Sequence, residues 1–127
     1  MAASDTILHP GMFPDSFADE DHLEEFMSTP SQALIDDLAA LEGDIAVLGC
    51  GGKMGVTLAR MVKRAAPKKR VLGVSRFSEP GLEEKMASWG VETLVCDMLE
   101  RDQVAAIPKL PNIIYMAGKK FGTEGAE

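Results

Sequence analysis

The sequence is poor in the residues and segments that mark secreted, metal-binding or membrane-spanning proteins. Only two of its 127 residues are cysteines, Cys50 and Cys96, and they have neither CxxC nor metal-ligand spacing, so we expect reduced thiols and no metal site. No apolar run approaches the roughly 18 residues of a membrane span, and the first residues lack the basic and apolar regions of a signal peptide. These absences predict a cytoplasmic protein that does not contact membranes.

Basic residues are missing from the first third of the chain. Residues 1–44 contain eleven Asp and Glu but no Lys or Arg, whereas residues 45–127 contain nine acidic and thirteen basic residues. Residues 1–28 also lack a sustained helical or strand period, so we expect an acidic arm that is mobile or loosely docked, with Phe13, Phe17 and Phe26 as candidate anchors. A solvated arm without a function is the simpler interpretation.

One domain is expected over residues 29–118, followed by a polar tail over residues 119–127. The domain begins with a helix predicted at 29–43, for which Thr29 is the expected N-cap and Gly43 the residue that ends it. This helix leads directly into the stretch that organises the domain.

That stretch is 45–55, IAVLGCGGKMG. Its first four residues form an apolar run of strand length without polar alternation, which is typical of a strand buried on both faces. Glycines follow at 49, 51, 52 and 55, and apolar residues then recur at helical spacing to about Ala66. Strand, glycine turn and helix in this order favour a dinucleotide-binding site, because the helix N-terminus presents unpaired N–H groups to a phosphate. A glycine turn that binds nothing is the alternative.

The spacing of Gly49, Gly52 and Gly55 is GxxGxxG, and it directly follows the hydrophobic strand. This pattern resembles the short-chain dehydrogenase/reductase superfamily, and more narrowly its extended NAD(P)-dependent epimerase/dehydratase family. The chain departs from the family at Leu48, where threonine is usual. The resemblance extends over residues 45–118 and implies that the chain is the nucleotide-binding part of such an enzyme.

Strands and helices alternate through the rest of the domain. Strands are expected at 71–75, 91–98 and 112–118, and helices at 80–88 and 99–107. This alternation predicts an α/β fold with a Rossmann-like parallel sheet of about four strands in the order 3-2-1-4, flanked by helices, as in a truncated doubly wound fold.

Basic residues cluster between Arg60 and Arg70, at the end of the central helix and just after it. Cations are favoured at a helix C-terminus, and no aromatic residues lie between these side chains. We therefore expect a solvated helix end and no nucleic-acid partner.

The ends of the parallel strands should meet at one edge of the sheet, where ligands of such folds bind. Ser75 and Arg76 follow the second strand, where an NAD enzyme would carry Asp or Glu for the ribose 2′-OH, so NADP is the preferred cofactor and NAD the second choice. Arg76 stacked on the adenine or pointing to water is the alternative. The candidate cofactor-binding residues are Gly49, Cys50, Gly51, Gly52, Lys53, Met54, Gly55, Ser75, Arg76, Asp97, Met98, Ala117 and Gly118.

The last four of these residues are assigned by the resemblance. It implies that Asp97 and Met98 lie at the adenine edge and that Ala117 and Gly118 line the cofactor ribose and pyrophosphate. For Asp97, a role as a turn residue at the strand end is equally open.

Tyr115 and Lys119 spell YxxxK, the catalytic signature of the superfamily. That signature needs a helix, on which four residues bring both side chains to one face. Tyr115 lies in a predicted strand, where four residues span roughly 13 Å, so we assign no catalytic residue and expect Tyr115 in the core or at a strand end.

The sequence thus predicts the NAD(P)-binding part of an epimerase/dehydratase-type oxidoreductase that is inactive alone. Its expected partners are a missing C-terminal substrate-binding part, or a second copy paired through the exposed edge of the last strand. A stand-alone NADP-binding regulatory module is the first alternative. A methyltransferase-like domain that binds S-adenosylmethionine is the second, because VLGCGG resembles the GCGxG turn, although Lys53 stands where that turn needs glycine.

Overall fold

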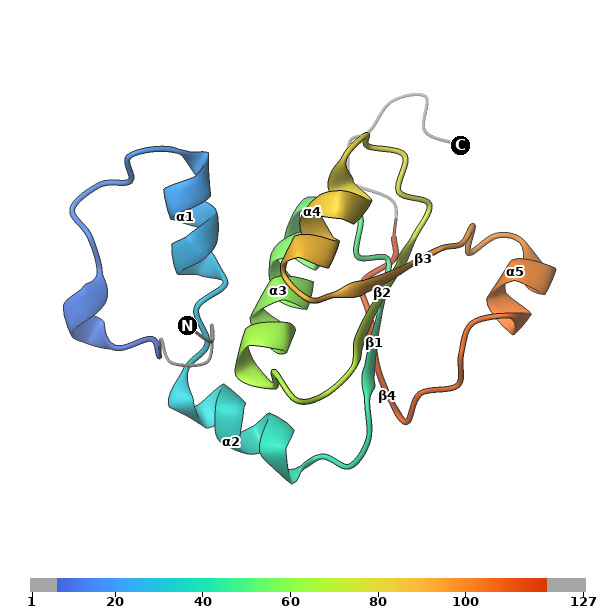
Figure 1. The fold of residues 1–127 in the computed structure, drawn as a ribbon, viewed down its shortest axis with the longest axis horizontal. Coiled ribbons are helices and arrows are strands. Elements are labelled where there is room, and N and C mark those ends of the chain that lie inside the picture. The colour runs from blue at the N-terminus through green and yellow to red at the C-terminus, as the bar shows by residue number, and fades with distance from the viewer. Residues whose placement is uncertain (1–6, 119–127) are drawn as a thin grey trace.

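A parallel four-stranded sheet is the centre of the structure, a computed structural model that describes residues 7–118 (Figure 1). Its strands are β1 (Ile45–Leu48), β2 (Val71–Ser75), β3 (Glu92–Val95) and β4 (Asn112–Tyr115), arranged β3-β2-β1-β4. The α/β class and the 3-2-1-4 order predicted from the sequence are confirmed. β1 has a neighbour on both sides and helices above it, which explains why its sequence is apolar without alternation.

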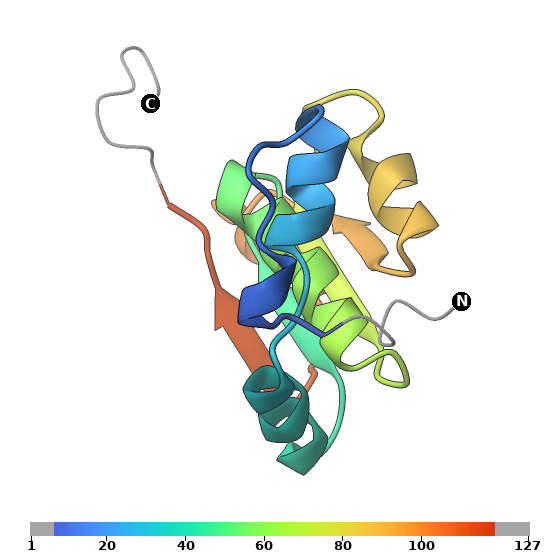
Figure 2. The ribbon, with the colours of Figure 1, turned by 90° about the vertical axis from the view of Figure 1, so that its left-hand side faces the viewer.

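The helices form unequal layers on the two faces of the sheet (Figures 1 and 2). α2, α3 and α4 cover one face, α1 lies outside α3, and α5 lies on the opposite face. Their bounds are η2 (Pro10–Met12), α1 (Glu20–Met27), α2 (Gln32–Ala40), α3 (Lys53–Ala65), α4 (Leu82–Ser88) and α5 (Arg101–Ala105). Among residues 7–118, none of these helices has the length and apolar character needed to cross a membrane.

Most of the core lies between the sheet and α3. Ile45, Val47 and Val71 point from the strands into this layer, where Val62 of α3 and Met86 of α4 are also fully buried. The opposite face has a smaller apolar cluster, in which Leu72, Val74 and Cys96 are covered by the chain around α5. The face that carries α3 is therefore the better packed one.

α2 begins later than the sequence analysis placed it. Ser31 is its N-cap and accepts a hydrogen bond from the Leu34 N–H at 3.2 Å. Thr29, the predicted cap, instead donates from its hydroxyl to the Glu25 carbonyl oxygen at 2.8 Å, at the end of the preceding helix. This acceptor belongs to α1, a helix that the sequence pattern does not predict.

The acidic arm contains a helix where no regular structure was expected. Asp19 caps α1 by accepting from the His22 N–H at 2.8 Å. The three phenylalanines pack against one another, with ring centroids 5.0 Å apart for Phe13 and Phe26 and 5.6 Å apart for Phe17 and Phe26. They form a small cluster of their own and are not part of either core cluster.

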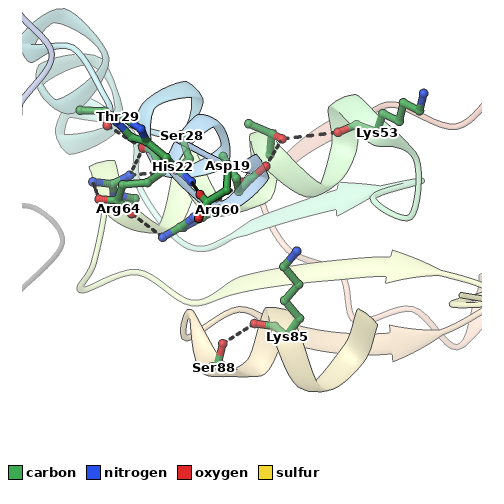
Figure 3. Close-up of polar contacts among 12 residues, drawn as sticks. Asp19, His22, Ser28, Thr29, Lys53, Arg60, Arg64, Lys85 and Ser88 are labelled. Atoms are coloured by element: carbon green, nitrogen blue, oxygen red, sulfur yellow. Dashed lines mark hydrogen bonds and ion pairs between the residues drawn. The ribbon is translucent and has the colours of Figure 1, made fainter. Parts of the chain in front are cut away.

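Ion pairs attach α1 to α3. The carboxylate of Glu25 pairs with Arg60 at 2.6 Å and with Arg64 at 3.0 Å, and Glu24 accepts from the Thr57 hydroxyl at 2.8 Å. Figure 3 shows these arginines turned toward α1. The prediction of a solvated basic helix end is therefore wrong for Arg64, which is only 4% exposed, because the acidic arm covers it.

Candidate functional site

The glycine turn leaves the carboxyl end of β1 and is tied to β2. The N–H groups of Gly49 and Cys50 both donate to the Val74 carbonyl oxygen, at 2.7 and 3.2 Å. Gly49 has a φ of +84°, a left-handed conformation that side chains with a Cβ disfavour. The chain thus turns sharply at the strand end before it enters α3.

Three of the four glycines are required by contacts inside the protein. A Cβ at Gly49 would lie 2.4 Å from the Ala117 backbone nitrogen, and one at Gly55 would lie 2.7 Å from the Cys50 Cα. A Cβ at Gly51 would lie 2.3 Å from the Ser75 Oγ. These glycines allow the chain after β4, the first turn of α3 and the end of β2 to approach the turn closely.

Gly52 differs from the other three. Its φ is −81°, which any residue adopts, and a Cβ there would have nothing within 4 Å. Neither strain nor internal packing within residues 7–118 therefore requires glycine at this position. Because glycine has no side chain, the space in front of the first turn of α3 stays open.

No side chain among residues 7–118 caps the N-terminus of α3. Asp19 and Ser31 cap α1 and α2, whereas Gly52, the N-cap of α3, contributes no side-chain hydrogen bond. The first helical bond runs from the Val56 N–H to the Gly52 carbonyl oxygen at 3.1 Å, which leaves the N–H groups of residues 53–55 without a partner in the helix. These donors, with the positive end of the helix dipole, form a ready site for an anion.

Lys53 and Met54 begin α3 and are exposed. A cation in the first turn of a helix opposes the dipole, so Lys53 costs stability unless a negative group binds nearby. Its side chain extends away from the Arg60 and Arg64 cluster in Figure 3. Among the described residues, no carboxylate lies within ion-pair distance of its ammonium.

Ser75 and Arg76 lie where β2 ends. The Ser75 hydroxyl accepts from the Phe77 N–H at 3.3 Å and lies directly under Gly51, so this side chain helps to shape the turn. Arg76 is exposed, and within residues 7–118 its guanidinium makes neither an ion pair nor a hydrogen bond. An exposed guanidinium therefore stands at the carboxyl end of β2.

Asp97 and Met98 follow β3. One carboxylate oxygen of Asp97 accepts from the Leu99 N–H at 2.9 Å, and the Asp97 N–H donates to the Gln103 side chain at 2.7 Å. Asp97 thus closes a turn between the end of β3 and the short α5. This is the role as a turn residue that the sequence left open beside contact with adenine. Met98 packs on the apolar cluster of the α5 face.

Ala117 and Gly118 complete the site from β4. Met116 donates its N–H to the Leu48 carbonyl oxygen at 2.7 Å, which brings Ala117 against Gly49. A Cβ at Gly118 would meet nothing within 4 Å. The structure therefore brings the ends of β1, β2 and β4 together around the glycine turn, and the Cys96 N–H links β3 to them through the Ser75 carbonyl oxygen at 2.8 Å.

Cys50 offers only its backbone to a ligand. Its side chain is fully buried in the core, and burial raises the pKa of the thiol to about 11. Such a thiol stays protonated at neutral pH and is neither a nucleophile nor a metal ligand. Within residues 7–118 there is also no cluster of three or more His, Cys, Asp or Glu side chains that could hold a metal ion.

Tyr115 lies at the end of β4 with 66% of its surface exposed, so it is a strand-end residue and not a core residue. Lys119, the other half of the YxxxK pair, lies outside the described residues. No catalytic residue is assigned from this pair.

Sequence reasoning missed the contact between the acidic arm and the side of α3. Two signals for it were present: the acidic residues gather in the first 44 positions, and Arg60 and Arg64 are four residues apart on one helix face. Comparison with known proteins adds no assignment, since no family model, no curated protein and no solved structure matches the chain.

Proposed function

We propose that the chain binds NADP(H) across the carboxyl ends of β1, β2 and β4, as the nucleotide-binding part of an epimerase/dehydratase-type oxidoreductase. The observation that carries this proposal is the N-terminus of α3, where an uncapped helix, a glycine with open space above it and a lysine coincide. Each of these features is neutral or unfavourable for an isolated fold. Together they suit a pyrophosphate held by backbone N–H groups.

The positive groups support NADP over NAD. Arg76 has no partner among residues 7–118 and can pair with a ribose 2′-phosphate at the end of β2, and Lys53 is exposed in the first turn of α3. A guanidinium binds such a phosphate through paired, charge-assisted hydrogen bonds, each contributing about 1.5 to 3 kcal/mol. Gly118 would leave room for the cofactor ribose and pyrophosphate, and the second carboxylate oxygen of Asp97 would face the adenine edge.

The candidate site does not itself supply the catalytic groups of an oxidoreductase. Among residues 7–118 the candidate site contains no buried carboxyl or imidazole group, and Tyr115 projects from the end of a strand. We propose that catalysis needs residues from a further part of the protein. Sustained NADPH oxidation by this chain with a carbonyl substrate would contradict this.

We also propose that a strand of another chain, or of a further part of the protein, pairs with β4. β4 is an edge strand whose Ile113 is 59% exposed, and within Asn112–Tyr115 it has neither a charged residue nor a proline. Such an edge is a template for another strand, from a substrate-binding part or from a second copy. A chain that stays monomeric at high concentration in light scattering would contradict pairing between copies.

The alternative of a stand-alone NADP-binding regulatory module is favoured by one observation. The acidic arm docks on α3, the same helix whose N-terminus would receive the pyrophosphate. Nucleotide binding could then alter the arm without any chemistry. Equal mobility of α1 with and without saturating NADP(H), measured by hydrogen exchange, would remove this alternative.

The proposal of nucleotide binding is tested by Gly52→Asp. The new side chain meets no atom of the described protein and can cap α3, so the fold is expected to be as stable as before or slightly more stable. Its carboxylate would occupy the phosphate position, and the affinity for NADP(H) should fall at least about tenfold. Ser31→Asp is the matched control, since it places aspartate at the N-cap of α2. Unchanged NADP(H) affinity in a folded Gly52→Asp chain would overturn the proposal.

A further inference from the structure

A groove of about 570 Å³ runs between α1 and the start of α4, above the first turns of α3. Figures 1 and 2 show α1 and α4 on the same side of the sheet as α3. The apolar side chains of the groove are Leu23, Met27, Val56, Pro80 and Leu82. Lys53 lines this groove, but the glycine turn and the residues that directly follow β2, β3 and β4, where the nucleotide site is proposed, do not, so this groove is a second feature of the surface.

α1 docks on the domain through its charged side and leaves apolar side chains outside. Glu24 and Glu25 bind α3, while Leu23 and Met27 are 38% and 50% exposed and no residue of α1 is fully buried. An amphipathic helix usually does the reverse and buries its apolar side. Leu23 and Met27 are one turn apart and line the groove, so they form an apolar wall that the fold itself does not cover.

Carboxylates surround this wall. Glu20, Asp21 and Glu24 come from α1, and Glu79 faces them from the segment before α4. Lys53 and Lys85 are the cations of the same groove. Glu24 is already engaged: one oxygen accepts from Thr57, and the other lies buried 3.9 Å from Arg60, beyond hydrogen-bond distance. Glu20, Asp21 and Glu79 remain exposed at the rim.

We infer that this groove is a docking site for a basic amphipathic segment of another protein. One or two apolar side chains of the segment would pack on Leu23 and Met27, and Lys or Arg residues beside them would pair with Glu20, Asp21 and Glu79. Charge complementarity selects this occupant, because exposed carboxylates outnumber the ammonium groups and the whole arm lacks a basic residue. An acidic or purely polar segment would leave either the charges or the apolar wall unmatched.

The test uses a short fluorescent peptide with leucine on one helical face and lysine on the other, and its binding to the full chain is followed by fluorescence anisotropy. We expect saturable binding that weakens as salt rises. Met27→Ser should weaken it about tenfold by removing apolar contact, and Glu20→Gln with Asp21→Asn about fivefold. Analogue peptides with glutamate for lysine, or serine for leucine, should not bind.

A matched control separates the groove from the general acidity of the chain. Asp37→Asn with Glu42→Gln removes the same charge from exposed positions outside the groove, and should change the affinity less than about twofold. Lys85→Glu replaces an ammonium group of the groove with a carboxylate and should strengthen peptide binding a few fold. A gain in affinity cannot result from loss of helix α1, which could weaken binding in the other variants. Equal effects of the two acid-removing pairs, no gain in Lys85→Glu, or no saturable binding would each overturn the inference.

Discussion

Arg64 of α3 holds Glu25 of α1 through two groups at once: its guanidinium donates to the Glu25 main-chain carbonyl oxygen at 2.8 Å and pairs with the carboxylate at 3.0 Å. The same guanidinium donates to the Ser28 hydroxyl at 2.8 Å. Burial lowers the pKa of Arg64, and the neighbouring Glu25 acts in the opposite direction by favouring the charged form. One buried side chain thus attaches the last turn of α1 to the domain.

The first prediction concerns this attachment. Arg64→Ala would leave the Ser28 hydroxyl and the Glu25 carbonyl without their donor, and we expect the free energy of unfolding to fall by about 2 to 3 kcal/mol. This is less than the roughly 3 to 5 kcal/mol of a fully buried pair, because the Glu25 carboxylate is half exposed. Urea unfolding measures the loss. Arg101→Ala, at an exposed position of α5, is the control and should change stability by less than about 0.5 kcal/mol.

The second prediction concerns Gly51 and Ser75. A Cβ at Gly51 would lie 2.3 Å from the Ser75 Oγ, so Gly51→Ala forces that hydroxyl to move and should cost about 1 to 3 kcal/mol. Ser75→Ala removes the hydroxyl and leaves its own Cβ 3.2 Å from the added atom. The double variant should therefore lose less than the sum of the two single losses, and a double-mutant cycle by urea unfolding measures the difference. Strict additivity would show that the two residues do not touch.

The third prediction concerns alkaline pH. The folded state holds the Cys50 pKa near 11, against an ordinary value of 9.0. Because the unfolded chain releases the thiol proton first, the stabilisation from Cys50 is present below pH 9 and is lost as the pH rises toward 11, by about 1.4 kcal/mol per unit. Cys50→Ala should remove this part of the slope. Parallel pH profiles of wild type and variant between these limits would refute the assignment.

The fourth prediction concerns the choice of nucleotide. The wild-type chain should bind NADP(H) at least about tenfold more tightly than NAD(H), and Arg76→Glu should abolish or reverse that preference, because a carboxylate repels the 2′-phosphate and accepts from a 2′-OH. Calorimetric titration of both nucleotides measures the ratio. Lys68→Glu makes the same charge change at an exposed position before β2, at the opposite end of the sheet, and should leave the ratio unaltered. A preference that survives Arg76→Glu would place Arg76 outside the site.

The sheet could be predicted from the sequence because each strand is an apolar run set between turn residues. Ile45–Leu48 and Val71–Ser75 are found where the pattern placed them, since both are interior strands whose burial leaves a continuous signal. β3 and β4 are edge strands and end earlier than predicted: Asp97 closes a turn after β3, and β4 ends at Tyr115. The side chains of these edge strands are only partly buried, so the apolar pattern in the sequence marks the ends of the strands less clearly.

The arm could not be predicted in the same way. α1 is stabilised by partners on α3, and a pairing such as Glu25 with Arg64 joins positions far apart in the chain, so no local period reveals it. Within the candidate site, the glycine positions followed from local spacing, because each serves a tight turn or a close approach. Gly52 differs from the other three because Ala117, Cys50 and Ser75 lie against those glycines and not against Gly52, and local spacing does not reveal contacts of this kind.

The contact between Gly49 and Ala117 also bears on the order of folding. Ala117 follows β4 and occupies the space where a side chain on Gly49 would be, so the turn after β1 makes this contact only when the chain that follows β4 lies against it. This contact closes a long loop, and loop closure of that length is slow compared with the formation of a single helix. During synthesis, the hydrogen bonds from the turn to Val74 can therefore form once β2 has emerged, whereas the contact with Ala117 forms only after the chain that follows β4 has emerged.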